Sequence, residues 1–181
     1  MRLQQYINEK FNMTGVMIGY EVDKNAFKSL SDQIGEILRD NNIPYELIVK
    51  PHISIAQITG KYPKDELKRE MDKIKPVKFN PKGITMFWGF NVKKWFVVAE
   101  YKARPEFTKK FKELSEKYEV RSFPGGMKPH TSLMMINEDI PEDIQNQIKS
   151  LGKKLPKIKV RGVALFNNKF QVEFKKKIKE K

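Results

Sequence analysis

The chain has 181 residues, a length that fits about one domain, and 39% of them are hydrophobic, as in ordinary globular proteins. It contains no cysteine, which excludes disulfides, thiolate-bound zinc, iron–sulfur clusters and a cysteine nucleophile. Lysine and arginine number 36 against 22 acidic residues, and the net charge of +14 suggests an anionic partner, namely a nucleic acid, a nucleotide or a membrane surface, with simple solubility as the alternative.

In chain order, the apolar pattern predicts a short helix or lead-in, a strand, a helix, an extended segment, a helix, two strands, a helix, an extended segment, a helix and a closing pair of strands. These elements are expected at 1–12, 15–22, 26–40, 45–59, 63–74, 83–90 with 94–101, 105–118, 128–136, 141–151, and 157–166 with 169–174. The lysine-rich end from Lys175 is expected to be a frayed tail.

The order of elements occurs twice. Residues 50–54, Lys-Pro-His-Ile-Ser, return 78 positions later as residues 128–132, Lys-Pro-His-Thr-Ser. The flanking residues repeat at nearly the same offset: Pro63 returns as Pro141, Gly83 as Gly162 and Phe87 as Phe166. We therefore expect one bilobal α+β domain over 1–181, with internal repeats at approximately 15–93 and 94–174. Two antiparallel sheets, with helices outside, would place equivalent residues on either side of a central cleft.

The two repeats hold both histidines of the chain. In a strand, alternate residues share a face, so His52 lies on the same face as Ser54, and His130 on the same face as Ser132, about 7 Å apart at ~3.3 Å per residue. Their neighbours should face the core: Ile53, Ile55, Thr131 and Leu133.

Two imidazoles and two hydroxyls across a cleft can hold one phosphodiester. The hydroxyls would donate hydrogen bonds to its non-bridging oxygens, one histidine would take a proton from the attacking hydroxyl or water, and the other would protonate the leaving oxygen. Histidine suits both roles because its ordinary pKa of about 6.5 makes either form available near neutrality. Which histidine is the acid, and whether water or a 2′-hydroxyl attacks, stays open at this point. The alternative is that both motifs are structural and were copied together, but histidine and serine on one strand face form a poor core.

No P-loop or dinucleotide fingerprint is present, so we expect no cofactor, and two histidines are too few for a three-histidine metal site. No apolar run approaches the ~20 residues of a membrane span, and the first residues show no apolar signal segment. We expect a cytoplasmic protein without membrane association or an obligate protein partner.

Two His-x-Ser motifs, one in each half of a chain of this length, resemble the two-histidine phosphoesterase superfamily, and the likeness spans roughly residues 15–174. The family includes 2′,3′-cyclic phosphodiesterases, proteins called 2′-5′ RNA ligases, and phage anti-CBASS nucleases that destroy cyclic-nucleotide signals. The resemblance implies a metal-independent mechanism in which His52, Ser54, His130 and Ser132 are the catalytic residues, within a bilobal fold that has the cleft between its lobes.

Four further residues are expected to bind substrate. Tyr20 and Trp88 offer aromatic faces on which nucleobases could stack, and Lys50 and Lys128 would add positive potential beside the histidines. Trp88 corresponds to Asn167 in the repeat, so symmetry does not require it. Core packing of the aromatic rings and solvated lysines are the structural alternatives.

The substrate class rests on the resemblance. RNA-ligase-type members often carry an arginine soon after the second motif, where this chain has Leu133-Met134-Met135. The anti-CBASS branch looks similar in the places of Tyr20 and Trp88, so the expected substrate is a cyclic di- or oligonucleotide signal, cleaved in the host cytoplasm if a phage encodes the chain. One alternative is a 2′,3′-cyclic or 2′-5′ RNA phosphodiesterase acting on RNA ends, which the charge fits better. The other is a basic RNA-binding module without chemistry.

Overall fold

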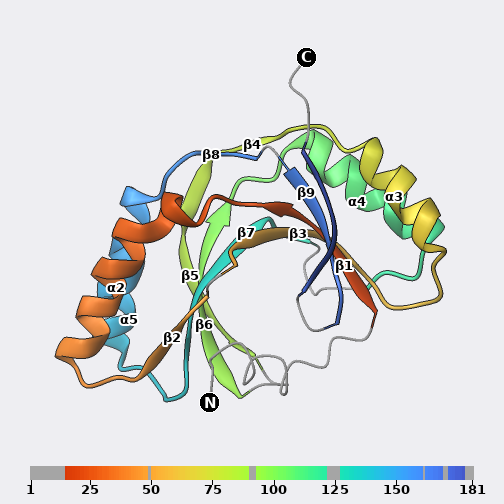
Figure 1. Cartoon of the computed structure of the whole chain (residues 1–181). Coiled ribbons are helices and arrows are strands. Elements are labelled where there is room, and N and C mark those ends of the chain that lie inside the picture. The colour runs from red at the N-terminus through yellow and green to blue at the C-terminus, as the bar shows by residue number, and fades with distance from the viewer. Residues whose placement is uncertain are drawn as a thin grey trace.

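The computed structural model describes residues 15–48, 50–89, 93–121, 127–160, 162–168 and 171–177. The helix expected at 1–12 lies outside these residues. Two four-stranded antiparallel sheets form the body of the structure (Figure 1). Sheet A has the order β10-β9-β1-β3, built from β1 (Val16–Glu21), β3 (His52–Ile58), β9 (Gly162–Phe166) and β10 (Val172–Lys177). Sheet B has the order β2-β7-β6-β5, built from β2 (Tyr45–Leu47), β5 (Pro81–Gly89), β6 (Lys94–Tyr101) and β7 (His130–Ile136).

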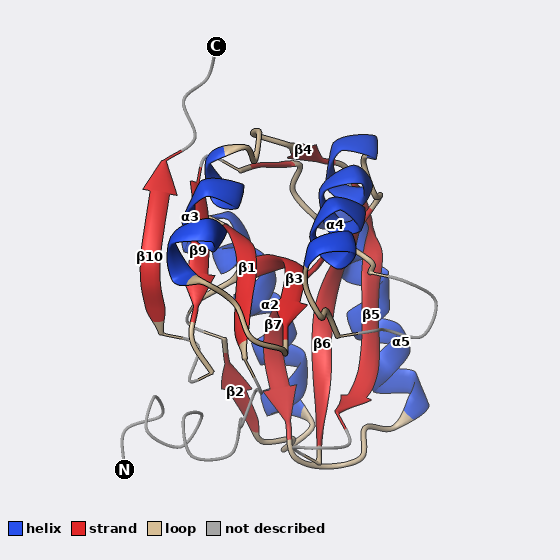
Figure 2. Cartoon of the chain, turned by 90° about the vertical axis from the view of Figure 1, so that its right-hand side faces the viewer, coloured by secondary structure: helices blue, strands red, loops and turns tan. Residues whose placement is uncertain are grey.

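The helices cover the outer faces of the two sheets. In Figure 2, α3 (Lys64–Asp72) and α4 (Pro105–Lys117) lie in front of the strands, and α2 (Lys28–Asp40) and α5 (Glu142–Ser150) lie behind them. Short 3-10 helices adjoin α2 and α5, namely η1 (Lys24–Phe27) and η2 (Leu151–Lys154). A small third sheet joins β4 (Lys78–Phe79) to β8 (Ile158–Lys159). The expected α+β architecture, with two antiparallel sheets inside and helices outside, is confirmed.

The core lies between the helices and the sheets. In α2 the buried residues Leu30, Ile34 and Leu38 recur every four positions and form one apolar stripe. The strands contribute the residues next to the histidines, and Ile53, Ile55, Thr131 and Leu133 are all buried, as the alternation predicts. None of the helices in the described residues has the length and apolar character needed to cross a membrane.

The boundary between the two sequence repeats does not separate the two sheets. The last strand of the first repeat, β5, pairs with β6, and the last strand of the second repeat, β9, pairs with β1. Each repeat therefore adds its closing strand to the sheet that holds the other repeat's first strand. β5 pairs with β6 because the two strands are consecutive in the chain, and consecutive strands usually pair as neighbours.

The lysine-rich end differs from the frayed tail expected from the sequence. Residues up to Lys177 form β10, which pairs with β9 along the edge of sheet A. Lys175 forms an ion pair with Glu21 at 2.7 Å, and Lys176 forms one with Asp72 at 2.5 Å. Lysines are common on exposed edge strands, where they oppose pairing with other chains. The composition of this segment therefore fits an edge strand as well as a tail.

Candidate active site

The two histidines stand at the same position of two neighbouring strands. His52 is the first residue of β3 and His130 the first residue of β7, and these strands lie side by side where sheet A meets sheet B (Figure 1). Ser54 and Ser132 follow two residues later on the same faces, and all four side chains are half-buried. The structure therefore brings the four expected catalytic residues onto adjoining strands.

Backbone carbonyls orient both imidazole rings in the same way. Nδ1–H of His52 donates to the carbonyl oxygen of Lys50 at 3.1 Å, and Nδ1–H of His130 donates to that of Lys128 at 2.9 Å. In a neutral imidazole with a proton on Nδ1, the acceptor nitrogen is Nε2. Nε2 is therefore the atom that takes or gives a proton in each ring. The lysines contribute through their carbonyls, while their side chains are exposed.

Each histidine also meets the equivalent phenylalanine of the repeat. The ring of Phe166 lies 5.0 Å from that of His52, and the ring of Phe87 lies edge-on 6.1 Å from that of His130. The two environments differ, since Phe166 is 3% exposed and Phe87 is 41% exposed. Burial lowers the pKa of His52 to about 4, and the charge of His130 lowers it further, against the opposing effect of the Lys50 carbonyl. His52 is therefore neutral at pH 7.

The hydroxyl of Ser54 is held next to its histidine. Its Oγ donates to Sδ of Met17 on β1 at 2.9 Å. A thioether is a weak acceptor, so exchanging it for a charged phosphoryl oxygen would strengthen the hydrogen bond. The Ser54 hydroxyl could therefore exchange this weak hydrogen bond for a stronger one to an anionic ligand.

Two of the expected substrate-binding residues face away from the histidines. Tyr20 is 1% exposed, packs edge-on against Phe79 and donates from its hydroxyl to the carbonyl of Lys75 at 3.4 Å. It pairs in register with Ile53, on the core side of β3, so the prediction that it stacks on a nucleobase is wrong.

Trp88 packs edge-on against Trp95, and it shares its face of β5 with Ile84, which is buried in the core. This is the face away from His130, so the structure does not place Trp88 beside the histidines. Its neighbour Phe87 lies on the histidine face instead. The repeat itself contained the signal, because Phe87 and Phe166 are equivalent.

Sequence reasoning also missed a pair of carboxylates. Glu21 is directly opposite His52 in the register of β1 with β3, and Glu100 is directly opposite His130 in the register of β6 with β7. Each is neutralised by a lysine: Glu21 by Lys175, and Glu100 by Lys82 at 2.9 Å. The two glutamates are 79 residues apart, the offset that relates Phe87 to Phe166. The repeat therefore holds a carboxylate, a histidine, a serine and a phenylalanine in each copy.

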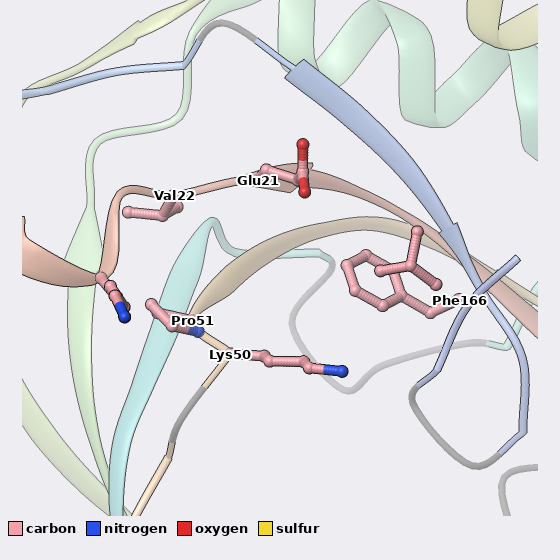
Figure 3. Close-up of a pocket in the computed structure, with 7 residues that line it drawn as sticks. Glu21, Val22, Lys50, Pro51 and Phe166 are labelled. Carbon is pink, nitrogen blue, oxygen red and sulfur yellow. The ribbon is translucent and has the colours of Figure 1, made fainter. Parts of the chain in front are cut away.

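A pocket opens between the end of β1, β9 and the chain that enters β3 (Figure 3). Its volume is about 240 Å³, and it is lined by Glu21, Val22, Lys24, Lys50, Pro51, Phe166 and Val172. Ligand pockets commonly measure ~300–1,000 Å³, so this pocket is smaller than most and would enclose only part of a larger ligand. In Figure 3 the Lys50 side chain extends toward Phe166, the residue that also touches the His52 ring. Lys50 lines this pocket and Lys128 does not, and the role of both lysines in substrate binding stays a prediction.

No group of three or more histidines, aspartates or glutamates that could hold a metal ion occurs within the described residues. That the protein works without metal remains a prediction, which activity measured in EDTA would test.

Comparison with known proteins identifies the fold. No protein-family model matches the chain, and no curated protein matches its sequence. Among solved structures, Usb1 of Kluyveromyces marxianus is similar with a TM-score of 0.62 at 12% identity, over 92% of this chain and 99% of that one. TT0787 of Thermus thermophilus is similar with a TM-score of 0.55 at 15% identity, over 90% of this chain and 97% of that one. LigT of E. coli, solved with 3′-AMP, is similar with a TM-score of 0.52 at 10% identity, over 92% and 98%.

These three proteins are members of the two-histidine phosphoesterase superfamily. The chain therefore has the two-histidine phosphoesterase fold that its sequence motifs resemble, over nearly its whole length.

Proposed function

We propose that this protein is a phosphodiesterase that cleaves RNA or nucleotide phosphodiesters with His52 as general base and His130 as general acid. One observation carries the proposal. Both histidines of the chain begin neighbouring strands with a serine on the same face, and both rings are oriented by the same Nδ1–H bond to a backbone carbonyl. The two histidines share this geometry, but Phe166 beside His52 is buried and Phe87 beside His130 is exposed, and such a difference in surroundings suits opposite halves of one proton transfer.

The reaction follows from these positions. Nε2 of His52 takes the proton from the attacking hydroxyl, or from water where the substrate is a cyclic phosphate, and the oxygen of this nucleophile forms a new bond to phosphorus. The bond from phosphorus to the leaving oxygen breaks, and Nε2–H of His130 gives its proton to that oxygen. The hydroxyls of Ser54 and Ser132 donate to the non-bridging oxygens, where negative charge accumulates. The enzyme ends with the proton on the other histidine, and exchange with solvent restores the starting state.

The substrate that we propose is an RNA end or a short oligonucleotide. A cyclic-oligonucleotide signal was expected from Tyr20, Trp88 and the missing arginine, but both aromatic side chains face away from the histidines. What supports an RNA or nucleotide substrate is the net charge of +14 and the pocket that contains Lys24 and Lys50. Solved structures of the same fold hold uridine monophosphate or 3′-AMP.

A panel assay tests this function. Purified protein is mixed, in EDTA, with a 2′,3′-cyclic-phosphate RNA, a 2′-5′ oligoadenylate, a 3′-5′ oligoribonucleotide, and cyclic di- and trinucleotides. We expect cleavage of at least one of the three RNA substrates, at a rate that EDTA leaves unchanged. Cleavage of the cyclic di- or trinucleotides alone would overturn the substrate assignment. Activity that requires an added divalent metal would overturn the mechanism.

The pH dependence of kcat/KM should report the assigned base. Because His52 must be unprotonated to accept a proton, activity should rise as the pH increases through its pKa of about 4 and be nearly complete by pH 6. Far-ultraviolet circular dichroism at each pH verifies that the fold persists. An acid limb centred near the ordinary histidine pKa of about 6.5 would contradict the assignment of His52 as a buried base.

A further inference from the structure

The exposed ring of Phe87 lies next to His130 and has no role in the proposed proton transfers. Phe87 stacks on Phe96 with ring centroids 5.3 Å apart and meets His130 edge-on. Phe87 is 41% exposed, and among the large apolar side chains of the described residues only Leu47 and Val172 are also exposed to this degree. A ring that is fixed on one side and open on the other offers a flat surface to a planar ligand.

The exposure of Phe87 follows from an asymmetry of the fold. In sheet A, β10 pairs with β9 and places Val172 opposite Phe166, which is then buried. In sheet B the equivalent strand β5 is the edge of the sheet, and no strand of the described residues covers Phe87 from that side. The same residue of the repeat is therefore a buried support for His52 in one sheet and an open surface beside His130 in the other.

We propose that Phe87 is the stacking platform for the nucleobase of the leaving nucleoside. This inference rests on the proposed function, in which His130 protonates the leaving oxygen. A nucleoside attached to that oxygen must lie on the His130 side of the scissile bond, where Phe87 is the open aromatic ring. The nucleoside that stays with the phosphate then lies on the His52 side, where the pocket containing Lys24 and Lys50 is found.

Two ligands that differ only in the leaving base test the proposal. The first is the dinucleoside monophosphate UpU, and the second is uridine 3′-methylphosphate, which has the same retained nucleoside and no leaving base. Binding of both is measured by calorimetry in the His52→Ala background, so that turnover does not interfere. Stacking on an aromatic ring is worth about 1–3 kcal/mol, so Phe87→Ala should weaken UpU by roughly 5- to 150-fold and leave the methyl ester within about twofold.

The controls separate stacking from structure. Phe87→Trp should retain UpU affinity, whereas Phe87→Leu should lose it despite keeping an apolar side chain. Leu47→Ala removes a side chain of similar exposure, 44%, from the β2 edge of sheet B and should affect neither ligand. Equal weakening of both ligands by Phe87→Ala, or no weakening of either, would overturn the proposal. If Phe87→Ala weakens UpU but not the methyl ester, while the protein with both histidines cleaves no substrate, the stacking role of Phe87 is supported and the proposed function is refuted.

Discussion

Replacing His52 or His130 with alanine should lower kcat by about 10²–10⁴-fold, because each variant loses one of the two proton transfers of the reaction. Nucleotide binding should persist, since the serines, the pocket and Phe87 remain. Initial rates on the best substrate of the panel give the loss, and calorimetric titration with uridine monophosphate verifies that binding is retained.

The double variant provides a sharper control. Groups that act as one unit are strongly non-additive, so His52→Ala with His130→Ala should be little slower than either single variant. Lys128→Ala is the matched control, because this variant retains the backbone carbonyl that orients His130 while removing an exposed side chain. A single histidine variant that keeps most of the parent activity would refute the mechanism.

Replacing Glu70 with alanine should produce the largest loss of stability. Glu70 on α3 is 3% exposed, and its carboxylate accepts from Lys110 at 2.9 Å, Lys73 at 2.8 Å and Lys117 at 2.5 Å. Lys110 on α4 is itself only 6% exposed. Removing the carboxylate leaves the buried ammonium group of Lys110 with only the partly exposed Glu113, at 3.3 Å, and breaking a buried ion pair in this way costs about 3–5 kcal/mol. Urea unfolding of the variant and its parent measures the difference.

A double replacement separates this charge effect from packing. Glu70→Leu with Lys110→Met removes both buried charges together, and such exchanges are often neutral or stabilising. The double variant should therefore recover most of the stability that Glu70→Ala loses. If it is as unstable as Glu70→Ala, lost packing rather than an unpaired charge is the cause.

The stabilisation that Glu70 provides should also vary with pH in a defined window. Burial alone would raise its pKa, but the hydrogen bonds from Lys117, Lys73 and Lys110 together outweigh burial and lower the pKa to about 2. The stabilisation is therefore present above the ordinary pKa of 4.5 and is lost as the pH falls toward 2. The gap in unfolding free energy between parent and Glu70→Gln should shrink over that range. A gap that stays constant down to pH 2 would contradict the ion-pair account.

The sequence predicted what depends on local periodicity. The alternation of His52 and Ser54 with Ile53 and Ile55 assigned both faces of β3 correctly, because one face is apolar and the other polar. In β1 the run from Val16 to Tyr20 is buried throughout, so no alternation marks its faces. A register shift between Ile18 and Gly19 adds to the ambiguity, and the side on which Tyr20 lies could not be inferred.

The features that the sequence did not predict depend on pairing between strands. Trp88 and Phe87 are adjacent aromatic residues of β5, and only the packing of Trp88 on Trp95 of the next strand shows which one faces His130. The exchange of closing strands between repeats, and the pairing of Lys175 with Glu21, join segments distant in the sequence. No local pattern determines such contacts.

The most direct test of the central claim uses the small number of histidines. Because the chain has only two, a two-bond ¹⁵N–¹H imidazole spectrum resolves each one, with His52→Ala and His130→Ala giving the assignment. Titration with uridine monophosphate should shift both imidazoles together, with one dissociation constant, and show the proton of each neutral ring on Nδ1. A shift confined to one histidine, or nucleotide binding that leaves both unchanged, would contradict a site in which His52 and His130 act on the same phosphate.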